Sequence, residues 1–194
     1  LRAEFGAGDG DYLVGGVGRL VARKGFDVLI RAFAEAGLPN ARLLIVGDGS
    51  ERSRLERLGG DRIVFAGFRR DVKDFYQAFD LFVCPSSYEP FGRVIAEALD
   101  AGVPVVAADS EGPRDIARRC PVELVPPDDA AALAESLRRH AAAGRIRVNT
   151  DLSEYSLERT AERMEDAYRA VLETVRPTAA TATGFAAARV LFAP

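Results

Sequence analysis

The sequence is poor in the residue types that build metal sites and nucleic-acid surfaces. Its 194 residues include one histidine and two cysteines, and Cys84 and Cys120 show no metal-ligand spacing. We therefore expect no metal, and we interpret both cysteines as core or incidental thiols in a reducing cytoplasm. Aromatic residues make up 8%, no long run of Lys or Arg occurs, and the formal net charge is −3, which argues against a nucleic-acid partner.

Long apolar runs are also missing. No run approaches the length that crosses a membrane, and residues 1–11 lack the charged-then-apolar layout of a signal peptide. The chain begins without Met, which is compatible with a fragment of a longer protein. We predict a leader at residues 1–11, one domain over residues 12–175, and a loosely ordered tail rich in small residues at 176–194.

Short apolar runs alternate along the chain with segments of helical periodicity. We expect strands at residues 12–17, 43–46, 63–66, 81–84, 105–108 and 122–125. Helices are expected at 26–36, from an N-cap at Ser50 to 58, after Arg70, from Phe91, from Asp128, and from Ser156 to about 175. This order predicts an α/β fold with a doubly wound, six-stranded parallel sheet that is Rossmann-like. The 48% of hydrophobic residues are enough for one sizeable core.

One stretch, residues 80–104, joins an expected buried strand to a helix through a polar turn. The apolar residues from Phe91 onward recur at helical spacing. Glu89 lies in the loop before this helix, and Glu97 lies on the helix, off its apolar stripe. Taken alone, Glu97 fits equally well as a partner of Arg93 one turn earlier, and Glu89 as a solvated loop residue.

The loops at the carboxyl ends of the expected strands carry charges of both signs. Arg19 and Lys24 follow the first strand, Arg69 follows the third, and Glu89 follows the fourth. Doubly wound sheets bind ligands at this edge, so these charges suggest a ligand with a phosphate part and a hydroxyl-rich part, such as a sugar nucleotide. A nicotinamide cofactor fits poorly, because the short G-x-G pattern is followed by Val21 where Gly or Ala is needed.

Several short motifs occur together in a fixed order. They are Gly18-Arg-Leu with Lys24-Gly25, Leu44-Ile-Val-Gly-Asp-Gly49, Val64-Phe-Ala-Gly67, Pro85-Ser, Glu89-Pro-Phe-Gly, Glu97-Ala, Gly102-Val-Pro-Val-Val106 and Leu124-Val-Pro-Pro127. In this order and spacing the sequence resembles the donor-binding domain of retaining GT-B glycosyltransferases, family 4, from about residue 12 to about residue 172. The most specific element is the pair Glu89 and Glu97, with seven residues between them.

The resemblance implies a role for each charged residue near the first and fourth loops. Arg19 and Lys24 match the residues that hold the diphosphate, and Glu97 matches the residue that binds the ribose hydroxyls. Glu89 matches the residue at the transferred sugar, where it would act in catalysis by supporting positive charge on the sugar. Without the family pattern, a solvated interpretation of Arg19 and Lys24 would prevail.

The start of the expected helix also matches donor contacts of the family. The amides of Phe91, Gly92 and Arg93 would meet the sugar and phosphate, and Gly92 leaves room for this approach. Phe91 fits equally well as a core residue. Arg69 matches a position that contacts the base, largely through the backbone. His140, the only histidine, is expected to be solvated on a helix surface and to have no role as a base.

The implied reaction is the transfer of a hexose-type group from a nucleoside diphosphate sugar to an unidentified acceptor, with the anomeric configuration retained. The resemblance implies neither a cofactor nor a metal. Such enzymes have an N-terminal acceptor domain, for which there is no room before Tyr12. A missing domain or partner chain would supply the acceptor site and any membrane association, so the isolated chain is expected to have little or no activity.

The chain departs from the family pattern at two places. Glu111 stands where a glycine is common, which weakens the case for a backbone contact from that loop to the ligand. The last helix lacks the usual aromatic-rich start, and we expect its apolar side, with Met164, Tyr168 and Val171, to be partly exposed or to dock elsewhere.

Two other interpretations stay open. The chain fits a non-catalytic nucleotide-sugar-binding module or one subunit of a split transferase. It also fits, less well, a fragment of a GT-B sugar-nucleotide epimerase, which expects a different set of carboxylates and histidines; the single His140 counts against it.

Overall fold

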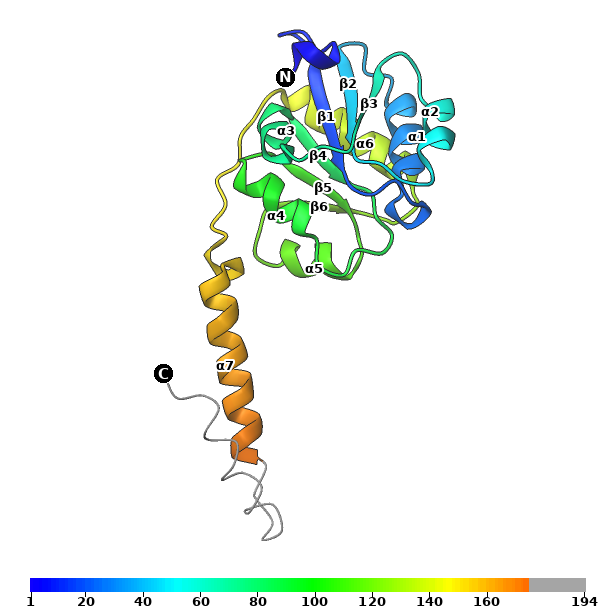
Figure 1. Cartoon of the computed structure of the whole chain (residues 1–194). Helices are drawn as coiled ribbons and strands as arrows, with labels where there is room; N and C mark the ends of the chain where they lie inside the picture. The colour runs from blue at the N-terminus through cyan, green and yellow to red at the C-terminus, as the bar shows by residue number, and fades with distance from the viewer. Residues whose placement is uncertain (175–194) are drawn as a thin grey trace. The chain divides into compact units, whose positions relative to one another are not determined.

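The computed structural model describes residues 1–174 and is built around a six-stranded parallel sheet (Figure 1). The strands are β1 (Tyr12–Val17), β2 (Ala41–Val46), β3 (Ile63–Gly67), β4 (Leu81–Cys84), β5 (Val105–Ala108) and β6 (Val122–Val125). Their order is β3-β2-β1-β4-β5-β6, which is that of a doubly wound sheet. The predicted fold class is therefore confirmed. The predicted tail, residues 176–194, lies outside the described residues.

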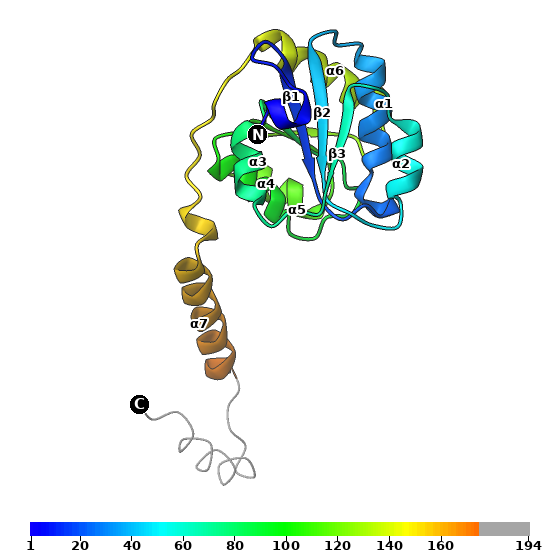
Figure 2. The same ribbon diagram turned by 45° about the horizontal axis from the view of Figure 1, so that its top comes forward.

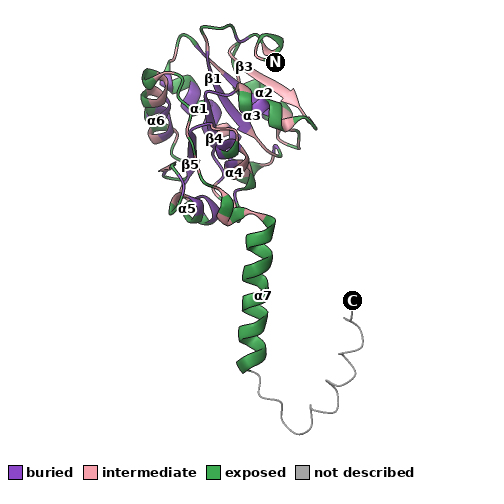
Figure 3. Cartoon of the chain, turned by 90° about the vertical axis from the view of Figure 1, so that its left-hand side faces the viewer, coloured by how far each residue is buried: buried purple, intermediate pink, exposed green. Residues whose placement is uncertain are grey.

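Helices cover both faces of the sheet (Figures 1 and 2). One face carries α1 (Phe26–Ala36), α2 (Arg52–Leu58) and α6 (Ala130–Ala143), and the other carries α3 (Val72–Ala78), α4 (Arg93–Asp100) and α5 (Glu111–Ala117). Because both faces are covered, the central strands are apolar without alternation, and every residue of β4 and β5 is buried. Figure 3 shows this buried layer in the sheet and in the inner sides of the helices.

The core depends on helical stripes that the sequence pattern predicts. On α1, Val28, Leu29, Ala32 and Phe33 recur at helical spacing, and all four are buried. They join a cluster with side chains of β1, β2 and α6. Burial of such side chains contributes about 1.5–3 kcal/mol each relative to exposure, so the sheet and its two helical layers stabilise one another.

Three predicted helix starts differ from the structure. The α2 helix begins at Arg52 and has no side-chain cap, so the N-cap predicted at Ser50 is wrong. The α4 helix begins at Arg93 rather than at Phe91, and the α6 helix begins at Ala130 rather than at Asp128. Capping explains the last case, because the carboxylate of Asp129 accepts a hydrogen bond from the Ala132 amide at 2.9 Å.

The chain divides into two compact units, Leu1–Asp151 and Leu152–Pro194. The first unit contains the whole sheet. In the second, the described residues form a 3-10 turn at Ser153–Tyr155 and the helix α7 (Leu157–Thr174), which has no buried residue. Among the described residues, no helix has both the length and the apolar character needed to cross a membrane.

The segment before β1 contacts the sheet through Arg2. Its guanidinium lies 2.9 Å from the buried carboxylate of Asp80 and donates a hydrogen bond to the Ala78 carbonyl at 2.8 Å. Asp80 also accepts the Leu13 amide hydrogen at 2.8 Å. These bonds satisfy a carboxylate that would otherwise be costly to bury at the amino end of β4.

Candidate functional site

The strands β1 and β4 are neighbours in the sheet, although β2 and β3 lie between them in the chain. Since the chain leaves β1 toward one edge of the sheet and β4 toward the other, the loops after these strands meet at the topological switch point. A Cβ atom on Gly25 would lie 2.2 Å from the Pro85 carbonyl oxygen, and Gly25 has a φ of +66°. Glycine at this position therefore lets the two loops touch.

A salt bridge joins the two loops. The Lys24 ammonium group contacts the carboxylate of Glu89, and both side chains are largely buried, with exposed fractions of 23% and 12%. The other carboxylate oxygen of Glu89 accepts the Gly92 amide hydrogen at 3.3 Å, just before α4. The structure thus brings together Lys24, which is predicted to bind phosphate, Glu89, which is predicted to bind the sugar, and the Gly92 N–H group. This combination can hold an anion beside a polyol.

Glu97 lies on the second turn of α4. The inner oxygen of its carboxylate, Oε2, faces α3, and the outer oxygen, Oε1, lies nearer Arg93. The hydroxyl of Tyr76 on α3 donates a hydrogen bond to Oε2 at 2.9 Å. Arg93 lies 3.8 Å from Oε1, so the pairing with Arg93 that the sequence left open does occur, at long range. Burial and the nearby Glu97 carboxylate raise the pKa of Tyr76 well above its ordinary value, which keeps the hydroxyl protonated as a donor.

The two predicted arginines line one cavity of about 290 Å³ at the carboxyl ends of β1, β2 and β3. The Arg19 side chain is exposed and makes no hydrogen bond or ion pair with the residues that the structure describes. The Arg69 guanidinium instead forms hydrogen bonds to Asp71 at 3.0 and 2.8 Å and lies 4.9 Å from the Phe75 ring centroid. The Arg69 side chain therefore presents little free charge to the cavity. This agrees with the prediction that Arg69 contacts the base of the donor through its backbone.

Three aromatic side chains stand exposed on loops at this edge. Phe91 is 73% exposed, so its interpretation as a core residue is wrong: it precedes α4 and does not share the helix's buried stripe. Tyr88 and Phe68 are also exposed, and Phe68 lines the cavity that contains Arg19. Exposed aromatic rings at a ligand edge offer flat apolar surface to a base or sugar.

The loop after β5 supports the loop that carries Glu89. The Gly112 amide donates a hydrogen bond to the Glu89 carbonyl at 2.8 Å, and the Ser110 hydroxyl donates one to the Ser86 carbonyl at 3.2 Å. A Cβ atom on Gly112 would lie 2.5 Å from that same Glu89 carbonyl oxygen. Glycine is thus needed at position 112, while Glu111 takes part in the first turn of α5.

His140 and the cysteines lie away from these loops or inside the sheet. The prediction that His140 is solvated is wrong, because its ring is only 18% exposed and lies 3.0 Å from Glu123. Cys84 and Cys120 are both buried, and burial raises the pKa of the Cys84 thiol to about 11. In the part of the chain that the structure describes, no group of three potential ligands is placed to hold a metal ion.

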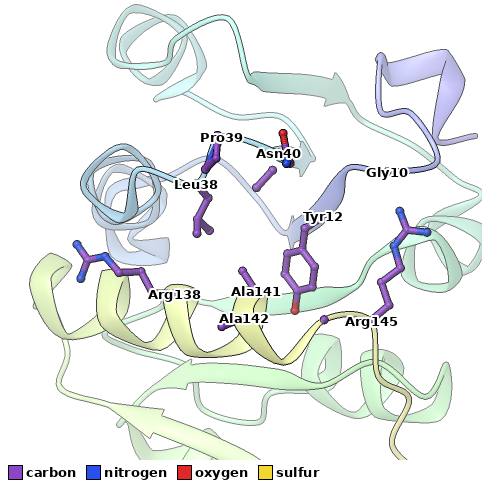
Figure 4. Close-up of a pocket in the computed structure, with 11 residues that line it drawn as sticks. Gly10, Tyr12, Leu38, Pro39, Asn40, Arg138, Ala141, Ala142 and Arg145 are labelled. Carbon is purple, nitrogen blue, oxygen red and sulfur yellow. The ribbon is translucent and has the colours of Figure 1, made fainter.

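A larger cavity, of about 420 Å³, lies at the opposite, amino edge of the sheet. Figure 4 shows Tyr12 of β1 directed toward the last turn of α6, with Arg138 and Arg145 at the two sides. None of the predicted site residues lines this cavity. The smaller cavity is lined by Arg19 and Arg69 and lies at the carboxyl ends of the strands, where doubly wound sheets bind ligands, so we assign the site to the carboxyl edge.

The charged residues of the candidate site are predicted from the sequence, whereas the residues that support them are not. Tyr76 reads as one of several apolar positions of a short helix, and only its hydroxyl distinguishes it from a core phenylalanine. The sequence gives no indication that Gly112 or Phe68 belongs to the site, because the loop that each one contacts is known only from the structure. The site therefore combines residues that a motif identifies with residues that only the packing identifies.

The chain matches one protein family and is similar in sequence to several glycosyltransferases. The family described as Glycosyl transferases group 1 matches residues 1–156. The lipopolysaccharide core biosynthesis glycosyltransferase LpsD of Rhizobium meliloti is 39% identical over 144 residues, which are 71% of this chain and 41% of LpsD. A GDP-mannose-dependent alpha-mannosyltransferase of Mycobacterium tuberculosis is 41% identical over 110 residues, or 56% of this chain and 28% of that protein.

Among solved structures, the chain is similar to Anabaena HepE in complex with UDP and glucose. The TM-score is 0.66 and the identity 32%, over 71% of this chain and 40% of HepE. The chain thus spans less than half the length of each of these proteins.

Proposed function

The chain belongs to the glycosyl transferases group 1 family, and on this basis we propose that its unit Leu1–Asp151 is the donor-binding half of a retaining glycosyltransferase. The donor is a nucleoside diphosphate sugar, and the group transferred is a hexose-type sugar. Relatives named for GDP-mannose and a similar structure with bound UDP support a nucleotide-linked donor without selecting the base.

The observation that carries the proposal is the meeting of Lys24 and Glu89 at the switch point. In the proposed complex, Lys24 and Arg19 bind the diphosphate, the amides at the start of α4 face its oxygens, and Glu97 binds the ribose hydroxyls. Charge that builds up on the leaving diphosphate is stabilised by these cations and N–H groups, which lowers the barrier to transfer. Glu89 lies at the sugar and supports positive charge near the reacting carbon.

The acceptor site of the proposed enzyme lies outside the donor-binding half. The chain covers 41% of LpsD and 40% of HepE, so we propose that an acceptor-binding domain or partner chain completes the enzyme.

Calorimetric titration of the whole chain with UDP, GDP, UDP-glucose and GDP-mannose tests the proposal. We expect one of the two nucleotides to bind with a micromolar to millimolar dissociation constant, and Glu97→Ala to weaken it about tenfold. An Asp100→Ala variant serves as the control, because Asp100 is an exposed residue at the end of the same helix. Absence of binding by all four compounds would contradict the proposal.

A further inference from the structure

We propose that Tyr76 is a positioning residue of the donor site, and that its hydroxyl holds the Glu97 carboxylate in the orientation that receives the ribose diol. This inference rests on the proposed function. Tyr76 donates to Oε2 of Glu97 at 2.9 Å, from the neighbouring helix α3. Since Glu97 is 41% exposed and Tyr76 is 1% exposed, the bond ties a flexible surface carboxylate to a rigid buried group.

The Tyr76 ring has little freedom to move. It packs edge-on against Phe79 at 6.1 Å and against Phe82 at 5.4 Å between ring centroids. Phe79 lies in turn directly on the backbone of β1, because a Cβ atom on Gly15 would come within 2.3 Å of its ring. The packing thereby fixes the Tyr76 hydroxyl relative to the sheet, and the hydrogen bond from this hydroxyl fixes the Glu97 carboxylate in turn.

The direction of the hydrogen bond has a chemical consequence. An ionised carboxylate only accepts hydrogen bonds, so Tyr76 must donate, and its proton occupies one of the lone pairs of Oε2. The outer oxygen Oε1 and the second lone pair of Oε2 remain for two hydroxyl donors. Adjacent ribose hydroxyls present such a pair of donors, whereas a carboxylate free to rotate would have to lose rotamer entropy on binding them.

The test compares nucleotides with and without the diol. Wild type, Tyr76→Phe and Glu97→Ala are titrated with UDP, GDP and the 2′,3′-dideoxy forms of both. We expect Tyr76→Phe to weaken binding of the ribonucleotide about fivefold to tenfold, and to change binding of the dideoxy form by less than about twofold. In a Glu97→Ala background, Tyr76→Phe is expected to have no further effect on discrimination between the two forms.

Tyr12→Phe is the matched control. Tyr12 is likewise a buried tyrosine, its hydroxyl has no hydrogen-bond partner among the described residues, and it lies at the opposite edge of the sheet (Figure 4). This variant is expected to bind every nucleotide as the wild type does. Thermal unfolding followed by circular dichroism establishes that each variant is folded at the temperature of the titration.

The outcomes separate the two proposals. If Glu97→Ala removes the preference for the diol and Tyr76→Phe keeps it, the donor site stands and the role of Tyr76 is overturned. Equal weakening of ribo and dideoxy forms by Tyr76→Phe shows a general packing role and also overturns it. If the wild type binds none of UDP, GDP, UDP-glucose and GDP-mannose, the donor proposal fails, and the inference about Tyr76 fails with it.

Discussion

Lys24 and Glu89 neutralise each other across the switch point. In the proposed donor complex, a diphosphate therefore competes with Glu89 for the Lys24 ammonium group. The pair is largely buried, where charges interact more strongly than at the surface. Glu89 therefore has two opposite effects on a donor. In the proposed donor complex, Glu89 orders Lys24 and faces the sugar, but it also repels the phosphate charge and occupies the Lys24 ammonium group.

This balance predicts opposite effects of two neutral substitutions at the pair. Lys24→Gln is expected to weaken nucleoside diphosphate binding about tenfold or more, because a charge-assisted contact is lost. Glu89→Gln is expected to strengthen binding of the free nucleoside diphosphate about threefold, because Lys24 is released and a negative charge is removed. Calorimetry with UDP and GDP measures both changes.

Arg23→Gln is the control for this pair, since Arg23 is an exposed cation on the same 3-10 turn as Lys24. It is expected to change the affinity by less than about twofold. Weaker nucleotide binding by Glu89→Gln would contradict the competition between Glu89 and the diphosphate.

The buried thiol of Cys84, at the end of β4, is expected to lower the free energy of unfolding at alkaline pH. Burial raises the pKa of its thiol from 9.0 to about 11, so the folded chain holds the proton more tightly than the unfolded chain does. The resulting stability is complete below pH 9.0 and is lost as the pH rises toward about 11. Urea unfolding at pH 8 and pH 10.5 is expected to show a decrease that is about 2 kcal/mol smaller in Cys84→Ala than in wild type. Equal decreases in both proteins would show that Cys84 does not cause the effect.

At the scale of elements, the site is built from loops that support one another. The first turn of α5 holds the loop after β4 through the bond from the Gly112 amide to the Glu89 carbonyl. The loop after β1 reaches the same place because Gly25 lies against Pro85. Three crossover connections thus converge on Glu89, which explains how an irregular loop can hold a defined geometry.

Gly112→Ala is expected to disturb this arrangement. The added methyl group would lie 2.5 Å from the Glu89 carbonyl oxygen and 2.8 Å from the Phe91 amide nitrogen, so the loop must move. We expect a loss of about 1–3 kcal/mol in the free energy of unfolding, and a larger loss of affinity for UDP-glucose or GDP-mannose than for UDP or GDP, because the shift acts at the sugar. Urea unfolding and calorimetry measure the two effects.

Gly60→Ala is the matched control, because Gly60 is exposed and a Cβ atom there would meet nothing within 4 Å. It is expected to leave both quantities unchanged. If Gly112→Ala weakened UDP as much as UDP-glucose, the disturbance would not be specific to the sugar position.

At the scale of the whole molecule, the sheet and its buried core belong to the unit Leu1–Asp151. The described part of the second unit has no buried residue, and Met164, Tyr168 and Val171 on α7 are exposed, as expected from the sequence. Burial of apolar area is the favourable term in folding, and the buried apolar residues among those described all lie in the first unit.

A chain that ends after Asp151 is therefore expected to unfold within about 3 °C of the 194-residue chain and to bind UDP or GDP within about twofold of its affinity. Calorimetric unfolding and nucleotide titration of the two chains, side by side, provide the measurement. A shortened chain that fails to fold, or one that loses nucleotide binding, would show that residues after Asp151 belong to the donor unit.

The order and type of the strands and helices follow from the sequence pattern, and the same pattern predicts the edge of the sheet at which we propose the site. The bounds of β1, β4, β5 and β6 agree with the predicted ones. For β4 and β5 the reason is that a strand buried on both faces is apolar throughout. The helix starts at Ser50, Phe91 and Asp128 were wrong, because caps and loop contacts decide where a helix begins.

Only the tertiary structure decided which residues meet. Lys24 and Glu89 are 65 positions apart in the chain, and Tyr76 and Glu97 are 21 apart. Periodicity encodes which face of an element is buried, but it does not encode which loops converge at the switch point or which helix lies beside α4. These contacts depend on the path of the crossover connections. A motif can therefore single out Lys24, Glu89 and Glu97, whereas the Lys24–Glu89 pair and the proposed role of Tyr76 follow only from the folded chain.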